Sequence, residues 1–429
     1  MSSERQPIGV IGTGYVGLVT AAGFAELGSD VYCVDIDASK IERLKRGEIP
    51  IYEPGLEELI ARNSARLHFS TELSEALEHA RLLFVAVGTP PTHSGDADLT
   101  AVNAVVEKMP GSDKHALVMK STVPCGTGAT IQRVFREGGK EAMSYVSCPE
   151  FLKEGSAVKD FMNPDRVVVG DDGGWAGEAV IELYGPLDAQ LVRTDIASAE
   201  MIKLAANAFL ATKISFINEI ANVCEETGAD VIEVARGVGL DDRIGPRFLQ
   251  AGIGYGGSCF TKDVSALKLL AANSGYHFQL LNAVTEVNEL QKRRVVSKLQ
   301  RHLGDLAGKQ VAMLGLAFKP ETDDMRGASS LVLAARLLAE GAKVHAYDPI
   351  AEQEARALMP QLGYCSSAAE ALAGADAAVL VTEWRELVEL DWAQVAAAMS
   401  GTLVIDGRNA LDPDAVRAAG LVYEGIGRR

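Results

Sequence analysis

Cys259 is the residue whose type and surroundings point most directly to chemistry. It lies in the segment Gly254-Tyr255-Gly256-Gly257-Ser258-Cys259-Phe260-Thr261-Lys262-Asp263. A thiolate is a carbon nucleophile that nearby cations favour, and glycines let a backbone approach a ligand closely. Lys262 can favour the anion, and Asp263 can move protons or orient a neighbour. A single cysteine in a glycine-rich turn is also the pattern of a small buried core residue, so the rest of the chain has to decide between the two interpretations.

A nucleotide-binding pattern opens the chain. Ile8 to Ile11 reads as a short apolar strand, the loop Gly12-Thr13-Gly14-Tyr15-Val16-Gly17 follows, and Leu18 to Leu27 reads as a helix. In this pattern the first glycine makes the tight turn, the second lets the backbone meet a pyrophosphate, and the third packs helix against strand. The next strand ends at Asp35, whose carboxylate can accept the ribose hydroxyls of adenosine and repel a 2′-phosphate. The pattern therefore predicts NAD rather than NADP.

Composition and charge narrow the class of protein. The 429 residues suffice for two or three domains, and 48% hydrophobic residues suffice for sizeable cores. No apolar run approaches the roughly 20 residues that span a bilayer, and no apolar leader is visible, so we expect a cytoplasmic protein without a membrane partner. The net charge of −17 argues against a nucleic-acid partner. The six cysteines form no CxxC pair, and the histidines have no ligand spacing, so neither disulfides nor a metal site is expected.

A long helix is predicted from Ala197 to Thr227, because these residues include no glycine or proline and apolar groups recur at helical spacing. Apolar side chains around much of its circumference indicate burial on several sides, as in a spine between domains or a dimer interface. Lys203 and Asn207 interrupt the apolar pattern four residues apart and so share one face. Taken alone, they are equally typical of a lysine that reaches solvent beside a polar neighbour.

Strand-like runs divide the remaining chain into α/β segments. They fall near residues 82–87, 116–119 and 166–169, and again near 310–316, 343–349, 377–382 and 403–406. The later group lacks the glycine loop and places cations at strand ends, which indicates an anionic ligand other than a second NAD. We therefore expect an α/β fold with two Rossmann-like doubly wound domains, 1–196 and 305–429. A central helical domain, 197–304, would join them, form the dimer and carry the Cys259 loop.

The chain resembles the UDP-glucose/GDP-mannose dehydrogenase family over nearly its whole length. The motifs that carry the resemblance are Gly12-Thr13-Gly14-Tyr15-Val16-Gly17, Val87-Gly88-Thr89-Pro90, Ser121-Thr122-Val123-Pro124, Pro149-Glu150-Phe151-Leu152-Lys153-Glu154-Gly155, Lys203-Leu204-Ala205-Ala206-Asn207-Ala208-Phe209, Gly256-Gly257-Ser258-Cys259-Phe260, Phe318-Lys319-Pro320-Glu321-Thr322-Asp323-Asp324 and Asp406-Gly407-Arg408-Asn409. The resemblance implies oxidation of a sugar primary alcohol to a carboxylate with two NAD per turnover. It also implies a homodimer through the central helix.

The resemblance gives each candidate catalytic residue a role. Cys259 would attack the aldehyde to form a thiohemiacetal, which is oxidised to a thioester and then hydrolysed. Lys203 and Asn207 would stabilise the developing oxyanion. The remaining roles are proton transfer for Asp263, assistance of thioester hydrolysis for Glu150, and positioning of the attacking water for Thr122.

The resemblance also implies two binding sets. The NAD set is Gly12, Gly14, Tyr15, Val16, Gly17, Asp35, Lys40, Thr89, Thr122, Glu154, Lys262 and Arg326. The UDP-sugar set is Glu150, Phe151, Leu152, Lys153, Glu154, Lys203, Asn207, Phe248, Leu249, Gln250, Ala251, Gly252, Tyr255, Gly256, Phe318, Lys319 and Arg408, together with Arg243, which would reach into the partner subunit's site. Gln250 departs from the family pattern, because many members have lysine there and this chain lacks that contact to the diphosphate.

Several functions remain open at this point. Cys259-Phe260 and Phe318-Lys319-Pro320 favour UDP-glucose, with UDP-glucuronate made for polysaccharide or related glycan synthesis. A GDP-mannose or UDP-N-acetylhexosamine dehydrogenase would use the same mechanism. A one-step alcohol dehydrogenase would release one NADH per sugar and would not need Cys259. A binding protein without catalysis would have no use for the set of Cys259, Lys203 and Asp263.

Overall fold

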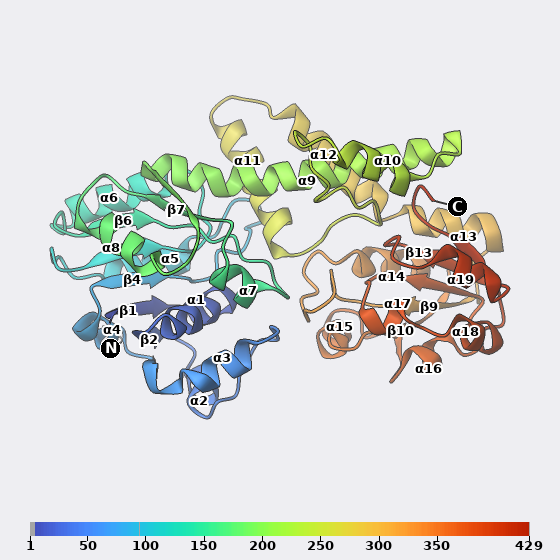
Figure 1. The fold of residues 1–429 in the computed structure, drawn as a ribbon, viewed down its shortest axis with the longest axis horizontal. Helices are drawn as coiled ribbons and strands as arrows, with labels where there is room; N and C mark the ends of the chain where they lie inside the picture. Colours follow the sequence, from blue (N-terminus) through green and yellow to red (C-terminus); the bar gives the residue numbers. More distant parts are fainter. Residues whose placement is uncertain (1–4, 94, 429) are drawn as a thin grey trace. The chain divides into compact units, whose positions relative to one another are not determined.

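The structure is a computed structural model that describes residues 5–93 and 95–428. It divides into two compact units, the first comprising the chain up to Ala206 with Ser265–Gly275, and the second comprising Asn207–Val264 with Tyr276 onward. Figure 1 shows a strand-rich layer with covering helices in each unit. The predicted α/β class and the two Rossmann-like domains are confirmed. The three-part division at residues 196 and 304 stays a prediction.

An eight-stranded sheet forms the centre of the first unit. Its strands in chain order are β1 (Arg5–Ile11), β2 (Ser29–Val34), β3 (Leu67–Ser70), β4 (Leu82–Val85), β5 (Ala116–Met119), β6 (Ser144–Ser147), β7 (Arg166–Gly170) and β8 (Gln190–Thr194). Their spatial order is β3-β2-β1-β4-β5-β6-β7-β8. All neighbours are parallel except β6 and β7. The first six strands have the 3-2-1-4-5-6 order of dinucleotide-binding folds, in which ligands bind beyond the carboxyl ends of the strands.

Alternation along the central strands produces two cores, one on each face of this sheet. In β4, Leu82 and Phe84 belong to one core, and Leu83 and Val85 belong to the other. A strand that is apolar at every position is typical of a parallel sheet with helices on both faces. The first core packs against α1 (Tyr15–Glu26), α2 (Ala38–Lys45), α3 (Leu56–Arg62), α7 (Ala157–Met162) and α8 (Trp175–Tyr184), and the second against α4 (Leu73–His79), α5 (Thr100–Lys108) and α6 (Thr127–Glu137).

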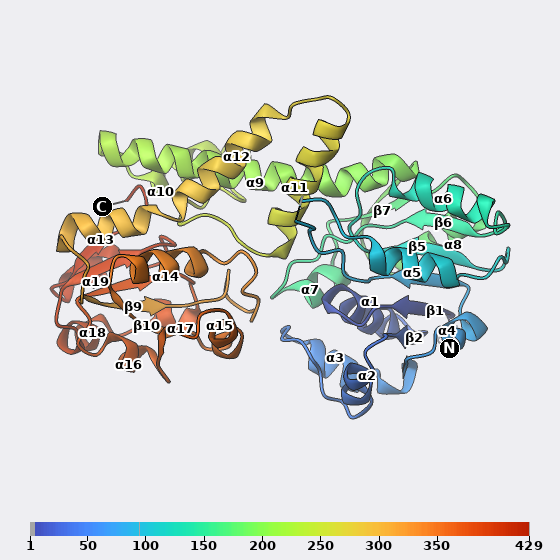
Figure 2. The ribbon, with the colours of Figure 1, turned by 180° about the vertical axis from the view of Figure 1, so that it is seen from behind.

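The second unit contains a six-stranded, all-parallel sheet. Its strands are β9 (Gln310–Leu314), β10 (Lys343–Tyr347), β11 (Gly363–Tyr364), β12 (Ala377–Leu380), β13 (Leu403–Asp406) and β14 (Val422–Glu424). The order β11-β10-β9-β12-β13-β14 repeats the Rossmann arrangement. The connecting and flanking helices, seen from behind in Figure 2, are α10 (Val231–Gly239), α12 (Gln279–Gln291), α13 (Arg294–Leu303), α14 (Ser329–Ala339), α15 (Glu352–Leu358), α16 (Ala368–Leu372), α17 (Arg385–Val388), α18 (Trp392–Ala398) and α19 (Pro413–Ala418).

Two helices carry the candidate catalytic residues. The 32-residue helix α9 (Ile196–Thr227) begins one residue before the predicted start and ends where predicted. It contributes Lys203 and Asn207, while α11 (Ser258–Asn273) contributes Cys259 and Asp263. The expected burial of α9 on several sides holds for Leu204 and Ile217, but Phe209 and Val223 are 66% and 57% exposed in this single chain. Some of the apolar side chains that suggested burial of α9 are therefore not covered by this chain.

Two features are absent from the described residues. Within 5–93 and 95–428, no helix combines the length and apolar character that a bilayer crossing requires. The same residues contain no cluster of three or more His, Cys, Asp or Glu side chains arranged to hold a metal ion.

Candidate active site

The glycine loop between β1 and α1 has the close contacts that its sequence predicts. Gly12 has φ +97°, and a Cβ there would lie 2.6 Å from the carbonyl oxygen of Ala86. A Cβ on Gly17 would lie 1.8 Å from the carbonyl oxygen of Gly12. Gly14 differs, because a Cβ there would meet nothing within 4 Å. The open side of this loop therefore lies at Gly14, the residue before α1, where free N–H groups favour an anion.

Asp35 lies at the end of β2 and is held in the ionised form. Its Oδ2 accepts hydrogen bonds from the backbone N and the hydroxyl of Thr13, both at 2.8 Å, and from Nζ of Lys40 at 3.0 Å. Burial raises the pKa of the Asp35 carboxyl, but these hydrogen bonds and that from the Asp37 backbone outweigh burial, so the pKa lies below its ordinary value. Lys40, predicted at the ribose, is thus the counter-ion of Asp35. Ile36, which the sequence analysis did not single out, is 92% exposed beside it.

The loops after β4 and β5 meet at the same edge of the sheet. The hydroxyl of Thr89 donates to the carbonyl oxygen of Thr122 over 2.8 Å, and the hydroxyl of Ser121 donates to that of Val87 over 2.7 Å. The two predicted threonines are therefore neighbours, although they are 33 positions apart in the chain. Because Thr89 uses its proton on a backbone carbonyl, it fixes the position of the Thr122 loop.

Glu150 and Lys203 form a buried ion pair in the first unit. Nζ of Lys203 lies 2.9 Å from Oε1 of Glu150, and it also lies 5.4 Å from the ring centre of Phe151. Burial raises the pKa of the Glu150 carboxyl, but the charge and hydrogen bond of Lys203, with a further contribution from Lys120, lower the pKa below its ordinary value. Glu150 is therefore a carboxylate at neutral pH. Lys153, another predicted substrate residue, does not join this pair. Its Nζ lies 2.8 Å from Oδ1 of Asp160, and its side chain is half exposed.

Glu53 is a buried carboxylate in this site that the sequence analysis missed. Its Oε2 accepts from the hydroxyl of Tyr15 and from the backbone N of Gly155, the latter at 2.7 Å. Its Oε1 accepts from the backbone N of Ala157, also at 2.7 Å, at the start of α7. Glu53 thereby joins the first residue of α1 to the segment after Glu154. Burial, followed by the Glu53 charge and hydrogen bond, raises the pKa of Tyr15 well above its ordinary range.

In the second unit, Cys259 occupies the second position of α11. The partial positive charge of a helix N-terminus stabilises an anion placed there. Asp263 lies one turn further along the same face, is 1% exposed, and accepts a hydrogen bond from the side-chain amide of Asn207 over 2.6 Å. Nζ of Lys262 lies 3.8 Å from the other carboxylate oxygen of Asp263. The backbone of Gly257 donates to the carbonyl oxygen of Arg326 over 2.8 Å, which fixes the loop before the cysteine.

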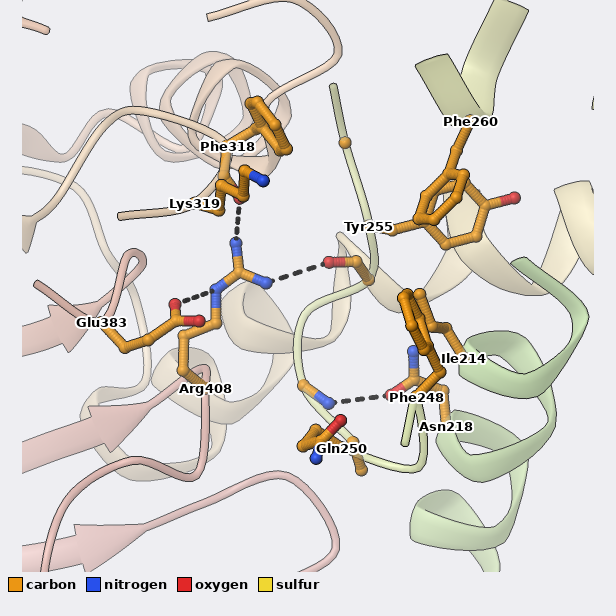
Figure 3. A pocket seen from close by; sticks show the side chains of 14 residues that line it. Ile214, Asn218, Phe248, Gln250, Tyr255, Phe260, Phe318, Lys319, Glu383 and Arg408 are labelled. Atoms are coloured by element: carbon orange, nitrogen blue, oxygen red, sulfur yellow. Dashed lines mark hydrogen bonds and ion pairs between the residues drawn. The ribbon is translucent and has the colours of Figure 1, made fainter. Parts of the chain in front are cut away.

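A cavity of about 260 Å³ lies in the second unit, next to the Cys259 loop. Its lining contains nine of the predicted substrate residues, namely Phe248, Gln250, Ala251, Gly252, Tyr255, Gly256, Phe318, Lys319 and Arg408. It also contains Ile214, Asn218, Gly254, Phe260 and Glu383, which were not predicted. Figure 3 shows Arg408, Lys319 and Glu383 on one side of the cavity and an apolar, mainly aromatic group on the other.

Arg408 organises the wall of this cavity. Its guanidinium donates to the carbonyl oxygens of Val381, Gly254 and Phe318 over 2.7, 3.2 and 2.8 Å. Its Nε also lies 3.3 Å from the carboxylate of Glu383. One side chain thus ties together three loops that are far apart in the sequence. Arg408 was predicted as a substrate ligand, and its cationic group lines the cavity while holding this wall in place.

The aromatic side of the cavity includes a strained residue. Phe248 has φ +66°, a left-handed conformation that is rare for residues other than glycine and that clusters at ligand sites. Its ring packs edge-on against Phe260 at 6.2 Å, and Phe260 packs in the same way against Tyr255 at 5.6 Å. Burial raises the pKa of Tyr255 to about 12, so this phenol is neutral at pH 7.

Three further predicted residues lie outside the cavity lining. Arg243 is 88% exposed at its side chain and pairs with Asp241. Arg326 is also largely exposed and forms a forked contact with Asp324 at 2.8 to 3.0 Å. Leu249 is buried in the core of the second unit rather than in the cavity wall.

Comparison with known proteins assigns the chain to a family. Three domain models of the UDP-glucose/GDP-mannose dehydrogenase family match in succession: the NAD binding domain over residues 6–188, the central domain over 197–290 and the UDP binding domain over 312–413. This chain belongs to that family. The chain is 47% identical to UDP-glucose 6-dehydrogenase TuaD of Bacillus subtilis (strain 168), over 98% of this chain and 93% of the relative.

Solved structures of the family have the same fold. A UDP-glucose dehydrogenase from Pyrobaculum islandicum matches with a TM-score of 0.91 and 38% identity, covering 100% of this chain and 99% of that one. A UDP-D-ManNAc dehydrogenase from Pyrococcus horikoshii matches with a TM-score of 0.86 and 26% identity, covering 99% of each. This protein is therefore an oxidoreductase, and its first unit contains the residues that match the NAD binding domain.

The residues of that part fit NAD. The unobstructed space above Gly14 at the start of α1 suits a pyrophosphate. The ionised Asp35 suits a ribose diol and opposes a 2′-phosphate. The cofactor of this protein is accordingly NAD.

Proposed function

We propose that this protein catalyses the oxidation of UDP-glucose to UDP-glucuronate, consuming two NAD and one water. The observation that carries the proposal is the position of Cys259 at the N-terminus of α11, with Asp263 on the same helix face and hydrogen-bonded to Asn207. An alcohol dehydrogenase that stops at the aldehyde needs no nucleophile. A four-electron oxidation needs a tetrahedral adduct of the aldehyde, because the second hydride must leave from such a carbon, and the thiol of Cys259 is suited to form that adduct.

The chain's residues would act in sequence. NAD, when bound, accepts a hydride in each of the two oxidations. After the first, Sγ of Cys259 adds to the C6 aldehyde, and its proton passes to the carbonyl oxygen to give a thiohemiacetal. Loss of the second hydride and of that proton gives a thioester. Water then adds to the thioester carbon, and the C–S bond breaks to return the thiol and release the carboxylate.

Charged and polar side chains would support these steps. Lys203 and Asn207 lie on consecutive turns of one face of α9, and both are donors suited to a developing oxyanion. Because Glu150 is ionised, it can accept a proton from the water that attacks the thioester. Asp263 would exchange protons with groups near the thiol, and Thr122 would orient the water. Thr89 supports that last role, because it fixes the Thr122 backbone.

The cavity of the second unit would hold the UDP portion. Lys319 and Arg408 provide positive charge on one side, and Phe248, Tyr255 and Phe260 provide aromatic surface on the other. Gln250 lines this cavity where many family members have lysine, so the diphosphate would depend on Lys319 and Arg408. In the first unit, the exposed Ile36 beside Asp35 would cover the adenine ring of NAD.

We also propose a homodimer through α9. Phe209, Phe216 and Val223 recur every seven residues on this helix and are 66%, 54% and 57% exposed. A stripe of this spacing on a long helix suits packing against the same helix of a second copy. Arg243, extended into solvent, would then reach the partner's site.

Two further parts of the proposal concern the product and the domains. The product would serve glycan synthesis. The chain would divide into three domains, with boundaries at residues 196 and 304.

The test is the number of NADH formed per mole of limiting UDP-glucose. Two NADH, with little formed from GDP-mannose, UDP-N-acetylglucosamine or UDP-N-acetylmannosamine, is the expected result. One NADH and accumulated aldehyde would replace the proposal with a one-step alcohol dehydrogenase. Two NADH from one of the other sugar nucleotides, and none from UDP-glucose, would keep the mechanism and reject the substrate.

A further inference from the structure

Asn218 has a buried hydrogen-bond donor for which the described residues provide no acceptor. The residue lies on α9, is fully buried, and lines the cavity of the second unit. Its Oδ1 accepts from the backbone N of Gly252 over 2.9 Å. Because that N–H can only donate, this contact fixes the orientation of the amide and identifies the other atom as Nδ2. Nδ2 makes no hydrogen bond within the described chain. Buried polar groups without a partner are rare, and one that lines a cavity points to a ligand.

The two sides of the cavity differ in character, and Asn218 lies on the apolar side. Figure 3 shows its amide next to Ile214 and Phe248. The oxygen of that amide accepts from the backbone N of Gly252, so the nitrogen is the atom left without a partner in the described chain. Arg408 and Lys319 lie across the cavity. A nucleoside diphosphate has the same polarity, since its phosphates are anionic and its base is flat and apolar on both faces. The base therefore belongs on the side of Asn218, and the phosphates belong on the side of Arg408.

We propose that Nδ2 of Asn218 donates a hydrogen bond to the C4 carbonyl of the uracil ring and so selects the base of the substrate. The inference rests on the proposed function, because it takes the ligand to be a uridine diphosphate sugar. The C4 edge is the part of such a nucleotide that lies farthest from the phosphates, and Nδ2 is fully buried on the side away from the cations. Cytosine carries an amino group at this position, so two donors would face each other and one hydrogen bond would be lost.

The test compares UDP with CDP by calorimetry on the full-length protein. The wild-type protein should bind UDP at least about tenfold more tightly than CDP. The informative variant is Asn218→Asp, which keeps the acceptor for Gly252 and replaces the donor by an acceptor. Its affinity for UDP should fall by about tenfold or more, while its affinity for CDP should stay or rise. The preference for UDP should therefore disappear or reverse.

A matched control lies one turn along the same helix. Asn222 does not line the cavity, and its amide donates to Gln291 over 3.2 Å. Asn222→Asp makes the same chemical change outside the cavity and should keep the wild-type preference for UDP. Equal loss of UDP and CDP affinity in Asn218→Asp would overturn the inference. So would equal affinity for UDP and CDP in the wild-type protein, which tests the proposal even when the variant does not fold.

The outcome separates this inference from the proposed function. Nucleotide binding needs no catalysis, so a reversal of preference in Asn218→Asp supports the role of Asn218 even when UDP-glucose is not oxidised. Oxidation of UDP-glucose together with an unchanged nucleotide preference in the variant leaves the reaction in place and rejects Asn218 as its base-selecting residue.

Discussion

Nζ of Lys203 lies 2.9 Å from Oε1 of Glu150, and both side chains are at most 5% exposed. The pair unites the predicted oxyanion-stabilising cation with the predicted assistant of hydrolysis. Lys203 lowers the pKa of the Glu150 carboxyl, and removal of either partner would leave a buried charge without its counter-ion, which is strongly unfavourable. The ion pair therefore keeps Glu150 ionised, which is the state that its proposed role in hydrolysis requires.

The first prediction concerns the pH dependence of this pair. The pKa of Glu150 is lowered in the folded protein, so its contribution to stability is present above the ordinary glutamate pKa of about 4.3 and is lost as pH falls through the folded value. Glu150→Gln should lower the unfolding free energy by about 1–3 kcal/mol at pH 7 and by progressively less below pH 4.3. Thermal melting of both proteins between pH 7 and pH 3.5 measures the difference. The exposed control Glu107→Gln should change little, and a difference independent of pH for Glu150→Gln would contradict the assignment.

The second prediction concerns Cys259. Cys259→Ala should retain NAD binding but lose the second oxidation, because no thiohemiacetal can form. NADH production from UDP-glucose should fall by on the order of 10³-fold or more, and NADH per sugar should not exceed one. Cys125→Ala removes another partly exposed thiol and should preserve both rate and stoichiometry. Two NADH per sugar at the wild-type rate from Cys259→Ala would show that another group is the nucleophile.

The third prediction concerns cofactor choice. Asp35→Ser removes the carboxylate that opposes a 2′-phosphate and releases Lys40 from its ion pair. KM for NAD should rise by about 10- to 100-fold, as expected for lost hydrogen bonds to a charged group, and the preference over NADP should shrink by a similar factor. Steady-state kinetics with both cofactors measures the change. Asp30→Ser removes a carboxylate from the other end of β2 and should leave the preference for NAD over NADP unchanged. An unchanged preference in Asp35→Ser would reject the role of Asp35 in cofactor choice.

The fourth prediction concerns the exposed stripe of α9. Phe216→Glu places a charge at the centre of the Phe209, Phe216 and Val223 stripe and should convert a dimer to a monomer at micromolar concentration. Light scattering after size-exclusion chromatography distinguishes the two states. Leu358→Glu alters a similarly exposed apolar residue on α15 and should leave the assembly intact. A wild-type protein that is monomeric, or a Phe216→Glu variant that stays dimeric, would exclude the proposed interface.

Local signals predicted a large part of the fold. The glycine loop, its flanking strands and Asp35 follow one another within about 30 residues, so their arrangement is set by turn geometry and helix packing nearby. The long helix was predicted almost to the residue, because uninterrupted helix formers with apolar spacing leave no other structure. Strands β3, β6, β8, β11 and β14 were not predicted, since most are short edge or near-edge strands with mixed polarity.

Side chains whose role depends on distant backbone were harder to predict. Glu53 lies in a short polar segment, and its partners Gly155 and Ala157 are more than 100 residues away. In the sequence, Asn218 resembles an ordinary polar residue on a helix surface. Its burial and its hydrogen bond with the backbone N of Gly252 follow only from the fold. Arg408 was recognised as a cation at a strand end, but its bonds to three carbonyl oxygens follow from loops that the sequence alone cannot align. An acidic or amide residue in an otherwise apolar surrounding is the only signal that these positions offer.

Glu53 has a consequence for communication within the first unit. The Glu53 side chain accepts hydrogen bonds from the hydroxyl of Tyr15, at the start of α1, and from the backbone N of Gly155, just after the segment of Glu150 and Glu154. A ligand that displaces Tyr15 must therefore change the free energy of that segment, and a ligand that orders the segment must change the affinity at Tyr15 by the same factor. With Tyr15 at the cofactor and this segment at the substrate, as proposed, the two ligands would be thermodynamically linked through a single shared acceptor.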